Sequence, residues 1–322
     1  WEIAKPDSTH DVFWRGHTEK YVDVAGHFRV RWVPGQVIKG VAYDTPIQGY
    51  DVINCNHLRL WSARAIESFA LDAFNTGDYY KAVEEEVHAE TVTKVLYPND
   101  EPDIGKRLRL LQQYFFVTCS LQDIIHIQID VAGLPLRELP NNWAVQLNDT
   151  HPSIAVAELM RLLVDVHHLD WHEAWKITVA TFGYTNHTLL PEALETWPLS
   201  LFGESLPRHL EIIYEINRRF LREVMTEHPG DGHMHRMSII EEGAERRVLV
   251  LPPHEAEVVE VDVRREHVDR GGQGTQGARP TASDAPWNES WDGMDPSGSA
   301  RDDRRRAAGL DGGSRGTLGW PS

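Results

Sequence analysis

Cysteine is scarce in this chain, which has only Cys55 and Cys119 among its 322 residues. Two cysteines provide no disulfide framework and no signal-peptide pattern precedes them, so we expect a reducing, cytoplasmic compartment. Long apolar runs are missing as well. None approaches the roughly 18 residues of a membrane-spanning helix, so we expect no membrane partner. The first residue is Trp1 and not methionine, which is typical of a sequence that begins inside a larger protein.

Positive charge is in deficit, with 32 Lys and Arg against 49 Asp and Glu and a formal net charge of -17. An acidic surface repels phosphate backbones, which makes nucleic acid an unfavourable partner. Otherwise the composition is that of a globular protein, because 41% of the residues are hydrophobic and 25% are charged. The length predicts two domains of ordinary size or one large domain.

Several motifs that would identify an activity are lacking. The sequence has no Gly-x-Gly-x-x-Gly, no Walker loop, no nucleophile elbow around Ser62 or Ser153, and no carboxylate pair typical of a glycosidase. Histidine is abundant, with 17 residues, and His167, His168 and His172 suggest a metal site. However, Asp170 has the position of a helix N-cap, which puts His168 and His172 on different elements. A metal-dependent hydrolase that uses these histidines remains an alternative hypothesis, which metal analysis of the purified protein tests.

The last part of the chain has a different composition. Residues 271–322 contain no Val, Ile, Phe or Tyr and are rich in Gly, Arg, Asp, Ser and Pro. Such a segment cannot bury enough apolar surface to offset the entropy of ordering it. We expect a disordered tail; an interaction tail is the functional alternative.

The part before it mixes strands and helices, which indicates an α/β protein. Alternation of apolar and polar residues predicts strands at 28–32, with a hairpin partner at 22–24, and at 37–43 and 57–63. Short strands are also predicted at 143–147 and 181–185. Helical periodicity covers 78–96, 105–125, 154–166 with Pro152 at its first position, 171–179 capped by Asp170, and 207–224 with an apolar core stripe.

Polar residues follow two of the predicted strands. Asp149 and His151 come after the strand at 143–147, and His187 comes after the strand at 181–185. In open α/β sheets, ligands bind at the carboxyl ends of the strands. If the two strands are parallel neighbours, these three residues share one rim. Taken alone, a histidine in such a place is more often a hydrogen-bonded structural residue than a catalytic one.

A series of short sequence motifs resembles those of the α-glucan phosphorylase family, which includes glycogen, starch and maltodextrin phosphorylases. The resemblance covers residues 1–247. The motifs that carry it most clearly are Tyr-Asp-Thr-Pro at 43–46, Leu-Arg-Leu-Trp-Ser-Ala at 58–63, Leu-Tyr-Pro-Asn-Asp at 96–100, Gln-Leu-Asn-Asp-Thr-His-Pro-Ser at 146–153, Tyr-Thr-Asn-His-Thr at 184–188 and Arg-Met-Ser-Ile-Ile-Glu-Glu-Gly at 236–243.

This resemblance implies a fold and a cofactor. Residues 1–248 are expected to form part of the Rossmann-like N-terminal domain of a GT-B type glycosyltransferase, and residues 249–322 a mostly disordered, non-family tail. The family's pyridoxal phosphate is held by a lysine in a second domain, and the last lysine of this chain is Lys176. After Val248 the sequence departs from the family, for which we hypothesise a frameshift, a misassembly or a gene-end artefact.

The implied activity is the phosphorolysis of the terminal α-1,4-linked glucose of glycogen or maltodextrin, which releases glucose 1-phosphate. By resemblance His187 is the catalytic-site residue. Its imidazole reaches the glucose 6-hydroxyl and its carbonyl faces the developing oxocarbenium ion, so neither role requires proton transfer. Substrate-channel residues implied in the same way are Asn99, Asp100, Glu101, Asp149 and His151, with Arg109 and Glu192 supporting them. Many members have Asn where this chain has Glu101.

The resemblance also implies partners. They are the α-1,4-glucan, orthophosphate and a second copy of the chain, because the helix at 78–96 matches the family's dimer contact. The runner-up hypothesis is a non-catalytic glucan-binding or interaction protein derived from a truncated phosphorylase.

Overall fold

The computed structural model describes residues 2–187, 195–229, 237–241, 243 and 246–249. By contacts the chain divides into two units, residues 1–264 and 265–322, and the second lies wholly outside the described residues. The first unit mixes strands and helices, as the sequence predicts. The predicted tail at 249–322 falls outside the described residues except for the backbone of Leu249.

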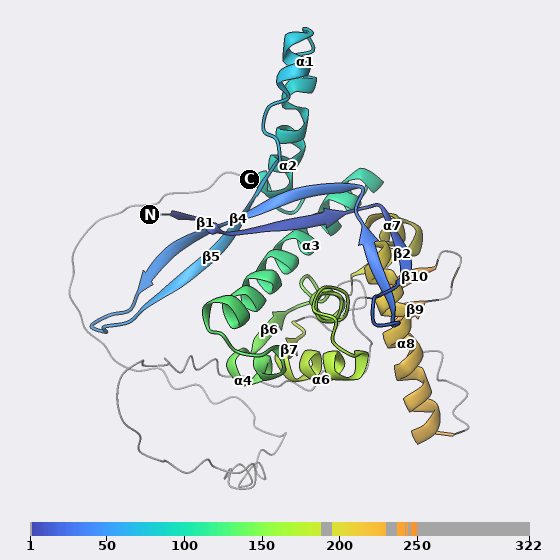
Figure 1. The fold of residues 1–322 in the computed structure, drawn as a ribbon. Coiled ribbons are helices and arrows are strands. Elements are labelled where there is room, and N and C mark those ends of the chain that lie inside the picture. Colours follow the sequence, from blue (N-terminus) through green and yellow to red (C-terminus); the bar gives the residue numbers. More distant parts are fainter. Residues whose placement is uncertain (1, 188–194, 230–236, 242, 244–245, 250–322) are drawn as a thin grey trace, which may run out of the picture. The chain divides into compact units, whose positions relative to one another are not determined.

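An antiparallel sheet of three strands opens the chain, in the order β1(Ile3–Trp14), β4(Gln36–Gln48), β5(Cys55–Arg64). Between β1 and β4, the hairpin of β2(His17–Val22) and β3(Phe28–Val33) turns at Gly26, whose φ of 86° suits glycine. The predicted strands at 28–32, 37–43 and 57–63 are confirmed, whereas the hairpin partner expected at 22–24 is β2, which ends at Val22. Figure 1 shows the sheet lying against α3(Asp103–His126), the helix expected at 105–125.

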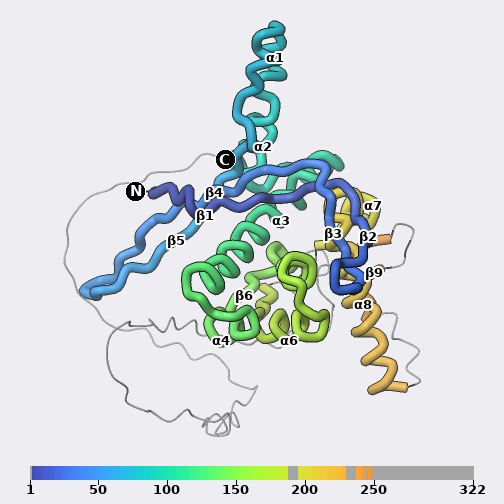
Figure 2. The backbone as a smooth tube through the Cα atoms, viewed as in Figure 1, coloured from blue at the N-terminus to red at the C-terminus, as the bar shows by residue number. Residues whose placement is uncertain are grey.

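The predicted helix at 78–96 is wrong in extent. A short helix α1(Leu71–Asn75) comes first, then a 3₁₀ turn η1(Lys81–Val83), and α2(Glu84–Lys94) follows. The Asp78 carboxylate accepts a hydrogen bond from the Lys81 N–H at 3.2 Å and starts a separate turn, and Val83 leaves the helical region with φ -118° and ψ 5°. Together α1, η1 and α2 form a projection. Figure 2 shows the backbone running from β5 through this projection and back into α3.

A parallel pair of strands lies beyond α3. The chain passes through the π-helical turn η2(Ile127–Val131), the 3₁₀ turn η3(Leu136–Glu138) and α4(Leu139–Asn142) into β6(Val145–Asn148). It returns through α5(Ala155–Arg161), the π-helical turn η4(Leu162–Val166) and α6(Trp171–Thr181) to β7(Phe182–Thr185). The two strands pair in parallel from Val145–Phe182 to Asn148–Thr185, which confirms the condition for a shared rim.

The details of the helices between these strands are partly as expected. Asp170 caps α6 by accepting a hydrogen bond from the His172 N–H at 2.8 Å, as predicted. Pro152, however, does not begin a helix. The Ser153 and Ala155 N–H groups bond back to the carbonyls of Thr150 and Pro152, so residues 151–154 form a turn and α5 starts at Ala155.

Three more strands and two helices complete the described chain. They are β8(Thr196–Pro198), α7(Leu199–Ser205), α8(Pro207–Glu227), β9(Ile240–Glu241) and β10(Arg247–Leu249), with sheet order β8-β10-β9. The predicted stripe of α8 faces inward, and Leu210, Ile213 and Ile216 pack against the core. A largely apolar cavity of about 410 Å³ lies beside it and is lined by Phe182, Trp197 and Phe220, among others. No helix of the described residues is long and apolar enough to cross a membrane.

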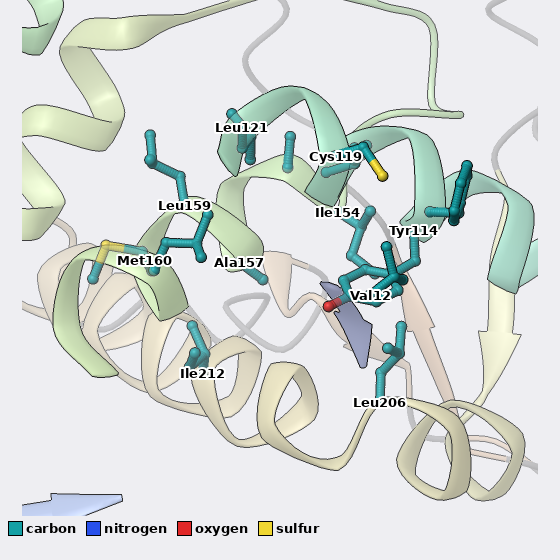
Figure 3. Packing of buried hydrophobic residues seen from close by; sticks show 14 of the residues in the cluster. Val12, Tyr114, Cys119, Leu121, Ile154, Ala157, Leu159, Met160, Leu206 and Ile212 are labelled. Atoms are coloured by element: carbon teal, nitrogen blue, oxygen red, sulfur yellow. The ribbon is translucent and has the colours of Figure 1, made fainter. Parts of the chain in front are cut away.

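The hydrophobic core joins α3, α5 and α8. Figure 3 shows Leu121, Leu159 and Ile212, one from each helix, gathered in one cluster. The first sheet also comes close to α3: a Cβ on Gly40 of β4 would lie 2.2 Å from the Cys119 sulfur, so only glycine fits there. Cys119 is buried and Cys55 exposed, and both are free thiols.

A buried ion pair ties the same three helices together. The Glu158 carboxylate of α5 accepts two bonds from the Arg161 guanidinium, at 2.6 and 2.8 Å, and one from His209 Nε2 of α8 at 2.7 Å. Thr118 of α3 donates a fourth, at 2.5 Å. Burial alone would raise the pKa of Glu158, but Arg161 and the hydrogen bonds outweigh it and lower that pKa to about 2. Burial lowers the pKa of His209, so this imidazole is neutral.

We expect Glu158→Gln to lower the free energy of unfolding by about 3–5 kcal/mol, because it leaves the Arg161 charge buried without its counterion. Glu215→Gln, which alters an ion pair on the surface of α8, is the control and should cost no more than about 1 kcal/mol. Urea unfolding of both variants measures the difference.

The same network predicts a pH dependence. Since the folded-state pKa of Glu158 lies below its usual value of 4.5, its contribution is complete above about pH 4.5 and is lost as the pH falls through about 2. The stability of the wild type should therefore fall more steeply over this interval than that of Glu158→Gln. Equal slopes for the two proteins would contradict the role given to Glu158.

Candidate functional site

The parallel pairing of β6 and β7 brings two chain exits to one edge. Asn148 lies opposite Thr185 in the register, and the Asp149 N–H continues the ladder by donating to the Thr185 carbonyl at 2.8 Å. Asp149 has a φ of 64°, a left-handed conformation that Asp tolerates better than most residues. Its carboxylate accepts a hydrogen bond from the Thr150 N–H at 2.8 Å, which holds the exit in this shape.

His187 stands at the second exit and is exposed. Its Nε2 contacts the side-chain oxygen of Asn148 at the end of β6. An amide oxygen only accepts hydrogen bonds, so Nε2 carries the proton and Nδ1 is the acceptor nitrogen of the neutral ring. Asn148 was not among the predicted site residues. The parallel register could have indicated it, because it places the last residue of β6 next to the exit of β7.

A second cluster forms around His151. Its Nδ1 lies 3.2 Å from Arg109 Nη2 of α3 and 3.1 Å from a carboxylate oxygen of Glu195. The other Glu195 oxygen lies 3.7 Å from Arg109 Nη2. The His151 side chain is 43% exposed, whereas Arg109 is 11% exposed, so the imidazole faces solvent above a largely buried guanidinium. His151 and Arg109 are among the residues predicted from the sequence, whereas Glu195 is not.

The loop that holds Asn99, Asp100 and Glu101 is attached to this cluster. The Arg109 guanidinium lies 4.3 Å from the ring centroid of Tyr97, a cation–π contact. At the other end of the loop, a Cβ on Gly105 would lie 1.8 Å from the Asn99 carbonyl oxygen. The loop is therefore seated against the first turn of α3, and its three predicted side chains are exposed.

The predicted site residues thus fall into three groups. Asp149 and His187 lie at the paired strand exits, His151 and Arg109 form one cluster, and Asn99 to Glu101 occupy the attached loop. Glu192 lies outside the described residues. Burial, followed by the negative charge of Asp149, raises the pKa of Tyr184 in β7, which keeps its hydroxyl protonated.

The histidine clusters do not form a metal site in the described part of the chain, where no group of three His, Cys, Asp or Glu could hold an ion. His168 lies in a loop and His172 in α6, on separate elements as expected. His10, His126 and His167 line a cavity of about 490 Å³ with Asp7 and Asp130.

The strand exits with Asn148, Asp149 and His187, together with the His151 cluster, form the candidate rim. This rim can hydrogen-bond a neutral, hydroxyl-rich ligand. It presents imidazole nitrogens that accept or donate, an amide, and carboxylate oxygens, all anchored on strand ends or on α3. Such groups match the alternating donors and acceptors of a sugar. Because Asn148 and His187 are exposed, a ligand has access to them from solvent.

Comparison with known proteins places most of this chain in one family. The carbohydrate phosphorylase family model matches residues 1–251. The glycogen phosphorylase of Synechocystis is 60% identical over 249 residues, which are 77% of this chain and 29% of the relative. The human muscle glycogen phosphorylase is 49% identical over 256 residues, 77% of this chain and 30% of the relative. A Dictyostelium discoideum glycogen phosphorylase is 48% identical over 243 residues, 75% of this chain and 24% of the relative.

The chain therefore spans less than a third of the length of these curated relatives. The match includes both strand exits, the His151 cluster and the loop at 97–102. With a family model over more than three quarters of its residues, this chain belongs to the carbohydrate phosphorylase family.

Proposed function

We propose that this chain supplies the glucose-facing rim of an α-glucan phosphorylase. The complete enzyme transfers the terminal α-1,4-linked glucose of glycogen or maltodextrin to orthophosphate and releases glucose 1-phosphate. The observation that carries the proposal is the parallel pairing of β6 and β7, which unites the Asn148–Asp149 exit with His187 inside the segment that the family model matches. A non-catalytic glucan-binding protein is less well supported, because the curated relatives at 48–60% identity are named as phosphorylases.

The rim residues bind and orient the sugar in this proposal. The Nε2–H of His187 donates a hydrogen bond to the side-chain oxygen of Asn148, so Nδ1 is left as an acceptor for a glucose hydroxyl. The backbone carbonyl of His187 lies just after the end of β7. A carbonyl dipole so placed stabilises positive charge that develops on the sugar ring. Asp149 and His151 contact further hydroxyls, and Asn99, Asp100 and Glu101 cover the sugar from the attached loop. Arg109 and Glu192 support them.

The finer assignment of the fold is part of the proposal. The β6–α5–α6–β7 segment is a parallel crossover of the kind found in Rossmann-like domains, and we propose a GT-B type N-terminal domain for residues 1–248. Residues 249–322 are then a tail outside that domain. A cytoplasmic location accords with two free thiols.

Pyridoxal phosphate is the cofactor that the family implies, and the residues of this chain do not fit it. The group is held through a lysine amine, and the candidate rim contains no lysine among the described residues. Lys106, on the first turn of α3, lies 3.4 Å from Asp103, and Lys176 is exposed on α6. We therefore assign the cofactor lysine to a part of the enzyme outside this chain.

The role of His187 is tested in a chimera in which residues 1–248 replace the matching segment of the Synechocystis glycogen phosphorylase. We expect His187→Ala to lower phosphorolysis roughly a hundredfold or more, because losing one transition-state contact costs about 2–4 kcal/mol. Asp149→Asn should also lower it, through positioning. The control, His172→Ala, alters an exposed side chain of α6 and should leave turnover unchanged. Near-normal turnover of His187→Ala would refute the assignment.

For the chain as it stands, we expect no phosphorylase activity. The reaction needs an anion site for phosphate, the cofactor, and an opposing surface that excludes water. The experiment expresses residues 1–322, adds pyridoxal phosphate, glycogen and orthophosphate, and measures glucose 1-phosphate and the absorbance of an internal Schiff base. Turnover, or one Schiff base per chain, would overturn the assignment of the cofactor lysine to another part of the enzyme.

We propose a homodimer as the assembly of the complete enzyme, through the projection formed by α1, η1 and α2. This projection is rich in exposed apolar side chains, including Tyr80 at 91% and Val87 at 59% exposure. The Phe74 ring packs at a tilt against Phe69, with centroids 5.2 Å apart, and in a T-shaped contact against Tyr79, with centroids 5.0 Å apart. Such an apolar surface is typical of a protein interface.

In the chimera, charge reversal at the exposed Glu85 of α2 should weaken this dimer, and Glu223→Lys on α8 is the control with the same charge change. Light scattering at low protein concentration measures the mass. We expect Glu85→Lys to dissociate at concentrations where the control remains dimeric. An unchanged mass for Glu85→Lys would count against this interface.

A further inference from the structure

We infer that Glu195 is the positioning residue of the candidate rim: it selects which nitrogen of His151 carries the proton and holds the Arg109 guanidinium beneath it. The inference rests on the proposed function for its biological meaning, since the sugar-facing role of His151 comes from there. The physical evidence for the inference is independent of that role, because it consists of the hydrogen bonds that converge on the Glu195 carboxylate.

The Glu195 side chain, 23% exposed, collects donors from two different elements. One oxygen accepts from the Thr150 hydroxyl at 3.0 Å and lies 3.1 Å from His151 Nδ1, both on the exit of β6. The other oxygen accepts from Gln113 Nε2 of α3 at 2.9 Å and lies 3.7 Å from Arg109 Nη2. Thr150 and Gln113 are themselves buried, so they fix the carboxylate in place.

This geometry decides the tautomer of His151. Its Nδ1 has two neighbours, Arg109 Nη2 at 3.2 Å and a Glu195 oxygen at 3.1 Å. A single ring nitrogen cannot accept from Arg109 and donate to Glu195 at the same time, and a guanidinium can only donate. The bond to the carboxylate is charge-assisted and is the stronger one. Glu195 therefore keeps the proton on Nδ1 and leaves Nε2 as an acceptor for a ligand hydroxyl.

Without the carboxylate the preference reverses. Arg109 would then donate to Nδ1, the proton would move to Nε2, and the imidazole would offer a donor where it now offers an acceptor. The effect extends to the attached loop, because Arg109 stacks on Tyr97, whose ring also meets His151 edge to face at 6.4 Å. Glu195 thus connects the β6 exit, α3 and the loop at 97–102.

The test is ¹⁵N NMR of histidine-labelled protein, residues 1–322, at a pH where imidazoles are neutral. A His151→Gln sample identifies the His151 ring signals. We expect Nδ1–H in the wild type and a shift of most of the population to Nε2–H in Glu195→Ala. Glu195→Gln, which keeps the shape of the side chain, should give an intermediate mixture and carries the test if Glu195→Ala does not fold. A Nε2–H ring in the wild type, or Nδ1–H in all three proteins, overturns the inference.

The control is Glu204→Gln, which alters the exposed Glu204 carboxylate that accepts from Arg107 Nη2 at 2.6 Å, and it should leave the His151 signals unchanged. A change there as large as in Glu195→Ala would mean that general perturbation, and not positioning, moves the proton, and would count against the inference. The tautomer is read without turnover, so it can fail separately from the proposed function, which the chimera with His187→Ala tests.

Discussion

The four-residue parallel ladder between β6 and β7 is the contact on which the candidate site depends. Parallel strands require a crossover, and here α5 and α6 provide it. Because both strands run the same way, their polar exits emerge at the same edge, and a bond from Asp149 to Thr185 extends the ladder into the loops. An antiparallel pairing of the same two segments would have sent Asp149 and His187 to opposite ends.

The ladder is supported by a core that uses α3 as its common element. Near its start, α3 carries Arg109 and Gln113, which meet His151 and Glu195. Farther along, Thr118 donates to the buried Glu158 of α5, which also binds Arg161 and His209. The same helix therefore connects the site to the most deeply buried charges. A rigid scaffold of this kind can hold hydrogen-bonding groups in fixed positions for a sugar.

Much of the fold could be predicted from local patterns, because alternation and helical periodicity report which side of an element is buried. The β2–β3 hairpin, α3, the Asp170 cap and the short strands β6 and β7 were all anticipated in this way. The break before α2 was not, since it depends on a local bond from Asp78 that competes with the helix. Asn148 and Glu195 were missed because their importance lies in partners 39 and 44 residues away, which no local pattern reports.

The central claim is that the rim at the ends of β6 and β7 binds the sugar. A crystal structure of the chimera with bound maltooligosaccharide tests it most directly. We predict a glucose unit whose hydroxyl lies within hydrogen-bonding distance, about 2.6–3.2 Å, of the His187 imidazole, with Asn148 behind it. A sugar found instead in the cavity lined by His10, His126 and His167, with no sugar at the strand exits, would contradict it.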